Sequence, residues 1–294
     1  MQVTFLVLAH RQPEQLAALA DLLVHHGDRV VVHVDAKVDA VPFHAATRAL
    51  GPAVRFTSRR HEVRWGGFGV VAATTTALSE AVSDAPGDYY ALLSGADLPI
   101  KPLPALHAEL ASGAVYMNSW PMPAEERGKP MSRLERWHYA PRDRDSRAAS
   151  RLNRHVLARL PRRDVARGLG GARPYGGSQW WLLPHGCAED VLGFVDRSPR
   201  FVRFFRHATV PDEMFFQTVL HALPGEREVR PHLTHTDWSR SPGRLSPAVL
   251  TVDDLPALAA SPKFFARKFD PDVDVEVCER VRRELVGAPA RPRG

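Results

Sequence analysis

Short apolar runs without polar interruption alternate with segments of helical periodicity along the first 120 residues. Runs with the length and β-branching typical of buried strands cover Val3–Ala9, 30–34, 54–57 and 89–93. Between them, apolar side chains recur at helical spacing in 13–26, 42–50 and 70–82. Successive strand–helix units of this kind favour a parallel sheet with right-handed crossovers.

The pattern breaks down between 121 and 177, where prolines, arginines and aromatic residues alternate without a clear period. Within this stretch, only 147–160 is typical of a helix, and that helix is basic. A stretch of this length inside a compact domain is often a lid or a binding loop. After it, a strand at 178–183 is followed by expected helices at 188–195, 201–206, 211–220, 253–260 and 273–285, with a short aromatic strand at 264–269.

Composition adds little to the fold but something to the choice of partners. The 294 residues are 44% hydrophobic and 24% charged, which is ordinary for a globular chain. The net charge of +6 and the pI of about 9.7 would suit an anionic partner such as nucleic acid, an acidic membrane face or a phosphorylated ligand. Much of the excess positive charge lies between Arg127 and Arg173. Net charge alone is weak evidence for nucleic-acid binding, and we expect no nucleic-acid partner.

The apolar runs, the N-terminal residues and the two cysteines bear on the location and redox state of the protein. No apolar run reaches the ~18 residues of a membrane span, and the N-terminus has no signal-peptide pattern. We therefore expect a cytoplasmic protein. Cys187 and Cys278 both fall in helical patterns, where they are expected as buried apolar side chains rather than as a disulfide.

Polar side chains follow the predicted strands at the points where the strands end. The strand at 89–93 runs into Ser94-Gly95 and then delivers the carboxylate of Asp97, while the strand at 30–34 delivers Asp35 and Lys37. Ligands of open α/β sheets bind at the carboxyl ends of strands, so a site is expected there. The paired glycines of Arg64-Trp65-Gly66-Gly67-Phe68 precede a helix and allow a close backbone approach, either to a ligand or within a tight turn.

Several familiar enzyme classes are not supported. The sequence contains no G-x-S-x-G elbow, P-loop or Rossmann glycine fingerprint. His10, His33 and His61 with Asp35 could suggest a metallohydrolase, but they lack the helical H-x-x-x-H pairing of such sites.

Seven short motifs, read together, resemble the Core-2/I-branching β-1,6-N-acetylglucosaminyltransferase family, which includes peptide O-xylosyltransferases. They fall in the family's order and cover nearly the whole chain: Leu8-Ala9-His10, His33-Val34-Asp35-Ala36-Lys37, Trp65-Gly66-Gly67, Leu93-Ser94-Gly95-Ala96-Asp97-Leu98-Pro99-Ile100, Gly177-Ser178-Gln179-Trp180, Pro211-Asp212-Glu213 and Phe265-Ala266-Arg267-Lys268-Phe269-Asp270. The resemblance implies an α/β, GT-A (Rossmann-like) fold, a UDP-sugar donor, inversion at the anomeric carbon, and no obligatory metal or other cofactor. It leaves 121–177 unaligned, and with it the acceptor.

On this basis we expect one domain, 1–294, with a central mostly parallel sheet and a basic insertion. Residues 1–120 would form the nucleotide-sugar-binding half. Residues 121–177 would be the basic insertion or acceptor loop, and 178–294 the acceptor and catalytic half.

Inverting transfer needs a base for the acceptor hydroxyl, and two carboxylates compete for that role. Glu213 is the first candidate, because the resemblance matches it to the family's catalytic base. An acidic residue at a helix N-terminus is also favoured by the helix dipole alone, and Asp212 would then be the cap. Asp97 is the second candidate, as base or as a ligand of the donor sugar's hydroxyls.

The departing diphosphate needs positive charge. The resemblance matches Lys268 to a diphosphate-binding lysine and Arg244 to an arginine, with Arg240 and Arg267 as alternates. Asp-x-Asp patterns at 143–145 and 270–274 could bind a metal, but arginine pairing and helix capping are the favoured interpretations, and no metal ligand is assigned.

Further donor contacts are expected from Asp35, Lys37, Trp65 and Gly66, with a loop salt bridge and a packed aromatic as the alternatives for Asp35 and Trp65. Trp180, Trp181 and Trp238 are candidate acceptor platforms, because indole faces stack on pyranose rings. If 178–183 is a strand, only one of Trp180 and Trp181 can face the site.

The sequence thus predicts an inverting, metal-independent glycosyltransferase that moves GlcNAc or xylose from a UDP-sugar to a glycan, protein or small-molecule acceptor, with peripheral membrane association open. The alternative is a catalytically silent transferase-like or basic module that binds an anionic partner.

Overall fold

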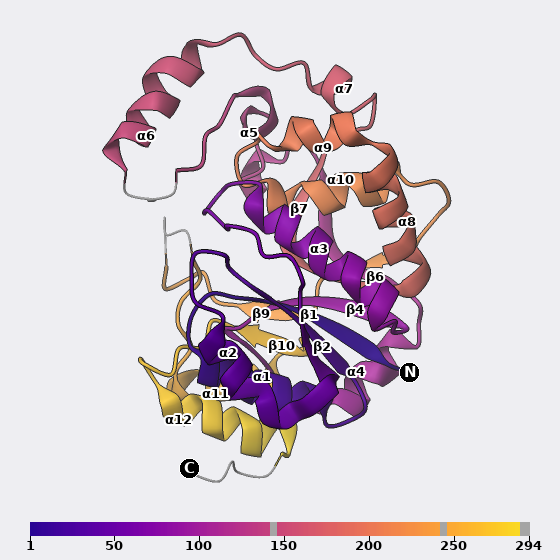
Figure 1. Ribbon diagram of the computed structural model, residues 1–294, viewed down its shortest axis with the longest axis vertical. Helices are drawn as coiled ribbons and strands as arrows, with labels where there is room; N and C mark the ends of the chain where they lie inside the picture. Colours follow the sequence, from indigo (N-terminus) through magenta and orange to yellow (C-terminus); the bar gives the residue numbers. More distant parts are fainter. Residues whose placement is uncertain (142–145, 242–245, 289–294) are drawn as a thin grey trace.

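The computed structural model describes residues 1–141, 146–241 and 246–288 (Figure 1). Seven strands form the central sheet in the order β3-β2-β1-β4-β7-β6-β8. Only β7 runs antiparallel to its neighbours, so the predicted α/β fold with a mostly parallel sheet is confirmed. The strands are β1 (Val3–Ala9), β2 (Arg29–Val34), β3 (Val54–Phe56), β4 (Tyr89–Ser94), β6 (Val115–Pro121), β7 (Tyr175–Pro184) and β8 (Val229–Arg230).

Helices cover both faces of this sheet, because neighbouring side chains of a strand point to opposite sides. Phe5 and Val7 of β1 belong to one apolar cluster, while Leu6 between them belongs to the other. The first cluster is closed by α1 (Pro13–Val24), α2 (Val41–Thr47), α4 (Leu103–Leu110), α11 (Leu255–Ala260) and α12 (Val275–Arg280). The second is closed by α3 (Gly69–Asp84), α8 (His185–Arg197), α9 (Pro199–Phe205) and α10 (Phe215–Ala222).

A second, three-stranded sheet was not expected. In it β10 (Phe265–Arg267) pairs antiparallel with β5 (Asp97–Pro99) and parallel with β9 (Thr234–Thr236). These strands are only three residues long, too short for apolar periodicity to reveal them. Their pairing brings the C-terminal segment around Lys268 to the end of β4.

The basic insertion connects the paired strands β6 and β7. It contains α5 (Ser132–Glu135), α6 (Arg147–Arg151) and α7 (Val165–Gly168), and α6 continues through single π and 3-10 turns to Arg159. The expected basic helix at 147–160 is therefore present, and Figure 1 shows α6 at the edge of the molecule.

The helix expected at 211–220 is two elements. Pro211–Glu213 forms a single 3-10 turn, Met214 (φ −141°) interrupts it, and α10 begins at Phe215. Residues 215–220 are all buried, so α10 is a core helix. No side chain caps either element, so the capping role expected for Asp212 was wrong.

Two smaller expectations concern cysteines and membrane spans. Cys187 and Cys278 are both free thiols, and Cys187 is buried, as expected. Among the described residues, no helix combines the length and apolarity needed to cross a bilayer.

Candidate functional site

Charged side chains from three separate segments meet at the carboxyl ends of β1 and β2. Their convergence is seen at His10, which directly follows β1. Burial lowers the pKa of His10, and Arg11, Lys268 and Lys37 lower it further, while Asp35 acts in the opposite direction. The predicted donor residues Asp35, Lys37 and Lys268 are thus all near enough to His10 to influence its pKa.

Asp35 and Lys37 also organise the loop that leads to the paired glycines. The buried carboxylate of Asp35 accepts hydrogen bonds from the backbone N of Lys37 (2.9 Å) and of Val63 (3.3 Å). Lys37 Nζ donates to the carbonyl oxygen of Val63 (2.6 Å) and lies 3.5 Å from Asp35 Oδ2. These contacts support the structural alternative for Asp35, whose contact with a nucleotide stays a prediction.

Lys268 follows β10, as the sequence indicated, and has an unpredicted cationic neighbour. Burial lowers the pKa of Lys268, with Arg11 and Arg267 adding to the effect and Asp270 opposing it. Arg11 itself pairs with Asp270 (2.8 Å). Arg11 lies just after the buried strand β1, and this position was the sequence signal that could have identified it as a site residue.

Asp97 is fully buried and both of its oxygens are engaged. Ser94 donates to them from its backbone N (2.9 Å) and its hydroxyl (2.6 Å), and Arg267 Nε lies 3.3 Å away. Burial raises the pKa of Asp97, against the effects of Arg267 and Ser94. An acceptor hydroxyl cannot reach this carboxylate in the described conformation, so its contacts favour a structural role over that of a base.

Glu213 lies in the turn before α10, with its side chain 28% exposed. One carboxylate oxygen, Oε2, accepts hydrogen bonds from Lys129 Nζ and from Arg133 Nη1 (2.6 Å). The same turn touches the paired glycines, because the backbone N of Val210 donates to the carbonyl oxygen of Gly66 (3.0 Å). Gly66 and Glu213, which are distant in sequence, are therefore neighbours in space.

Asp212, next to Glu213, is the most unusual titrating group of this turn. Burial raises the pKa of Asp212 to about 7, and the adjacent Glu213 contributes, while Lys129 and Arg133 oppose the rise. Carboxylates with such shifts are concentrated at functional sites. The sequence offered no sign of this, because burial depends on packing from other segments.

The predicted tryptophans differ sharply in exposure. Trp65, a predicted donor contact, is 43% exposed, so it is not the packed aromatic of the alternative interpretation. Of the predicted acceptor platforms, Trp238 is 50% exposed, whereas Trp180 and Trp181 are buried. Trp181 packs against Phe216 in the core, and the Arg267 guanidinium lies 4.2 Å from the ring centroid of Trp180. Neither Trp180 nor Trp181 therefore offers an open ring face to an acceptor. The expectation that one of the two would face the site is not met.

The sequence agrees with a known family over most of its length. Residues 3–259 match the family model described as "Branch: Core-2/I-Branching enzyme". The chain belongs to the Core-2/I-branching enzyme family.

Relatives within and near this family are distant. The chain is 27% identical to Xylosyltransferase 1 of Rattus norvegicus and 26% identical to Xylosyltransferase 2 of Homo sapiens, in each case over 98% of its own residues. It spans only about a third of these relatives' lengths, 36% and 34% respectively. Among solved structures, mouse xyloside xylosyltransferase 1 in its apo form is similar with a TM-score of 0.37 and 12% identity, covering 90% of this chain and 97% of that one.

The remaining predicted residues of this Core-2/I-branching chain divide into two groups. Arg244 and the pattern at 143–145 lie outside the described residues. Arg240 pairs with Asp237 (2.7 Å) and Asp254 (2.8 Å), and Asp274 caps α12 by accepting from Val277 N (3.0 Å). Across residues 1–141, 146–241 and 246–288, no three His, Cys, Asp or Glu side chains are grouped so that they could hold a metal ion.

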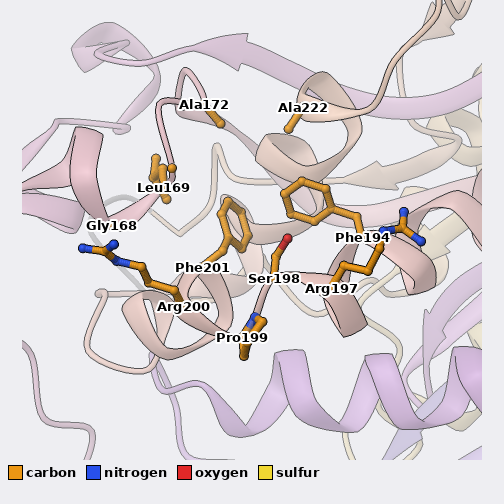
Figure 2. A pocket seen from close by; sticks show the side chains of 11 residues that line it. Gly168, Leu169, Ala172, Phe194, Arg197, Ser198, Pro199, Arg200, Phe201 and Ala222 are labelled. Atoms are coloured by element: carbon orange, nitrogen blue, oxygen red, sulfur yellow. The ribbon is translucent and has the colours of Figure 1, made fainter.

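A pocket of about 450 Å³ opens between α7, α8 and α9, away from these residues (Figure 2). Its lining is mostly apolar, with Leu169, Phe194 and Phe201, and Arg197 and Arg200 lie at its rim. It includes none of the predicted site residues, and we do not assign it to the Core-2/I-branching reaction.

Proposed function

We propose that this chain is a glycosyltransferase that moves a sugar from a UDP-sugar donor to an acceptor hydroxyl, with inversion. Family membership supports the class of reaction. The observation that carries the proposal is that both parts of such a site adjoin the segment Val63–Gly66. Lys37, at the end of β2, donates to Val63 O, and Val210, in the turn that carries Glu213, donates to Gly66 O.

The two parts have complementary roles in such a reaction. Glu213 takes the proton of the acceptor hydroxyl as its oxygen attacks the anomeric carbon. The bond between that carbon and the phosphate oxygen breaks, and UDP leaves with the bonding electrons. Lys268, Lys37 and Arg11 would bind the diphosphate and stabilise its growing charge.

Fixed cations of this kind can replace a divalent ion, so we propose that transfer is independent of metal. No other cofactor enters the proposed reaction.

UDP-xylose and UDP-GlcNAc are the proposed donors. Xylose has the support of relatives that are named xylosyltransferases. The acceptor would be a glycan, a protein hydroxyl or a small molecule, approaching past the 121–177 insertion.

Donor binding is tested by thermal shift with UDP, UDP-xylose and UDP-GlcNAc, each with and without EDTA. A ligand at 100 times its dissociation constant stabilises the folded state by about 2.7 kcal/mol. We expect a shift with UDP and with at least one sugar, unchanged by EDTA, and a much smaller shift in Lys268→Met.

The matched control is Lys101→Met, since Lys101 lies over the Phe264 ring and takes no part in the charged group around His10. Equal shifts in Lys268→Met and Lys101→Met would refute the diphosphate site. No shift with any nucleotide would refute the proposed function.

A further inference from the structure

The two oxygens of the Glu213 carboxylate have different surroundings. Lys129 and Arg133 both bind Oε2. In the part of the chain that the structure describes, Oε1 has no hydrogen-bond or ion-pair partner. The Glu213 side chain is 28% exposed. One oxygen is therefore held by two cations, and the other has no partner among the described residues.

The surrounding structure holds the Lys129 side chain against Oε2 of Glu213. Its side chain is only 9% exposed, and lysine is almost never buried in this way without a partner. The stem runs over Gly176 of β7, where a Cβ would lie 3.0 Å from Lys129 Cγ. Its backbone is fixed by a two-way bridge to Ala124. Gly176 thus leaves the space that the lysine stem occupies.

Arg133 is anchored from the other direction. Its carbonyl oxygen accepts a hydrogen bond from the backbone N of Thr209 (3.0 Å), one residue before Val210. Nearby, His138 N donates to the carbonyl oxygen of His207 (3.0 Å). The insertion is therefore fastened along 207–209, next to the turn that carries Glu213.

Two carboxyl groups and two cations meet in this turn. Asp212 and Glu213 are adjacent carboxylates, and Lys129 and Arg133 are the cations that act on them. The imidazole of His138 lies beside Gly66. Lys129 and Arg133 bond to Glu213 and also act on the adjacent Asp212.

We propose that Lys129 and Arg133 are positioning residues that hold Oε2 of Glu213 and leave Oε1 as the oxygen that takes the acceptor's proton. This inference rests on the proposed function and gives the insertion a part in it. The proton moves from the acceptor hydroxyl to Oε1 of Glu213. At the same time the acceptor oxygen bonds to the anomeric carbon, and UDP departs. The two cations then favour loss of the proton to solvent, which restores the carboxylate.

The test measures UDP release from UDP-xylose and UDP-GlcNAc, with water as acceptor, between pH 5 and pH 9. Loss of either cation leaves the Glu213 carboxylate less well oriented, so we expect Lys129→Met and Arg133→Met to release UDP about 10- to 100-fold more slowly across this pH range, with unchanged affinity for UDP. Arg133→Lys keeps the charge that faces Oε2 and is expected to recover part of the rate.

The matched control is Arg136→Met, an exposed cation of the same insertion. Its profile and rate should equal those of the wild type. If Lys129→Met fails to fold, the more exposed Arg133 gives the same information through its two variants.

Three outcomes are distinguishable. A slower release of UDP with unchanged UDP affinity, partly restored in Arg133→Lys, supports the positioning role. Wild-type profiles in both Lys129→Met and Arg133→Met overturn it while leaving the proposed function intact. A wild-type protein that binds no UDP overturns the proposed function itself.

Discussion

Asp97 and Arg267 form a buried ion pair whose removal should destabilise the fold, independently of any effect on activity. Asp97 has no exposed surface, and the Arg267 guanidinium lies between its carboxylate and the Trp180 ring. The pair joins β5 to β10, directly opposite each other in register. Asp97→Asn keeps the shape of the side chain and removes its charge, which leaves Arg267 without its counter-charge.

Breaking a buried pair by removing one partner costs about 3–5 kcal/mol, because the other charge stays buried. Arg267 is partly accessible, with its side chain 18% exposed, so water can solvate it to some extent. We therefore expect the lower end of that range, about 3 kcal/mol, for Asp97→Asn. Arg267→Met should cost a similar amount, and the double variant less than the sum, with a coupling of about 1–3 kcal/mol.

Urea unfolding followed by circular dichroism measures these free energies. The control is Glu284→Gln, which breaks the exposed pair with Arg280 (2.9 Å) and should leave the midpoint unchanged. If Asp97→Asn costs less than about 1 kcal/mol, the carboxylate is not a structural group, and it returns as a candidate for the base.

Three further predictions concern the site and its loops. In Asp212 the folded-state pKa, about 7, exceeds its ordinary value of 3.8, so folding binds a proton and the free energy of unfolding should fall as pH rises from about 4 to about 7. Asp212→Asn should abolish that fall, of the order of 2–4 kcal/mol, in urea titrations across this range, and an unchanged slope would contradict the assignment. Gly66 has φ +69°, so Gly66→Ala should lower the free energy of unfolding by about 1 kcal/mol in thermal unfolding. The control Gly186→Ala, within α8, should raise it. Changes of the same sign in both variants would be inconsistent with strain at Gly66. Transfer from the active UDP-sugar should be unchanged by EDTA and by added manganese, and activity that EDTA removes and manganese restores would refute metal independence.

The sheet could be predicted from the sequence because its strands are continuous apolar runs, and the polar residues at their ends mark one edge. Asp35, Lys37 and Lys268 were found in this way or by resemblance, and all three influence the pKa of His10. The three-stranded sheet escaped prediction, because Asp97–Pro99 and its partners are too short to carry a period.

The surroundings of Glu213 could not be predicted for a different reason. Lys129 and Glu213 are 84 residues apart, and nothing in the local pattern of the insertion indicates the contact. The burial of Asp212 and of Trp180 likewise depends on packing between distant segments. Alternation along β7 correctly gave two faces, but both faces are covered.

The role of Glu213 as the base is tested most directly by the turnover of Glu213→Gln. Release of UDP from UDP-xylose and UDP-GlcNAc would be measured for the wild type, for this variant and for the control Glu126→Gln, whose carboxylate is exposed. A general base contributes about 10²–10⁴-fold, so Glu213→Gln should lose at least a hundredfold in turnover while calorimetry shows an unchanged affinity for UDP. Near-normal turnover in Glu213→Gln would contradict the account.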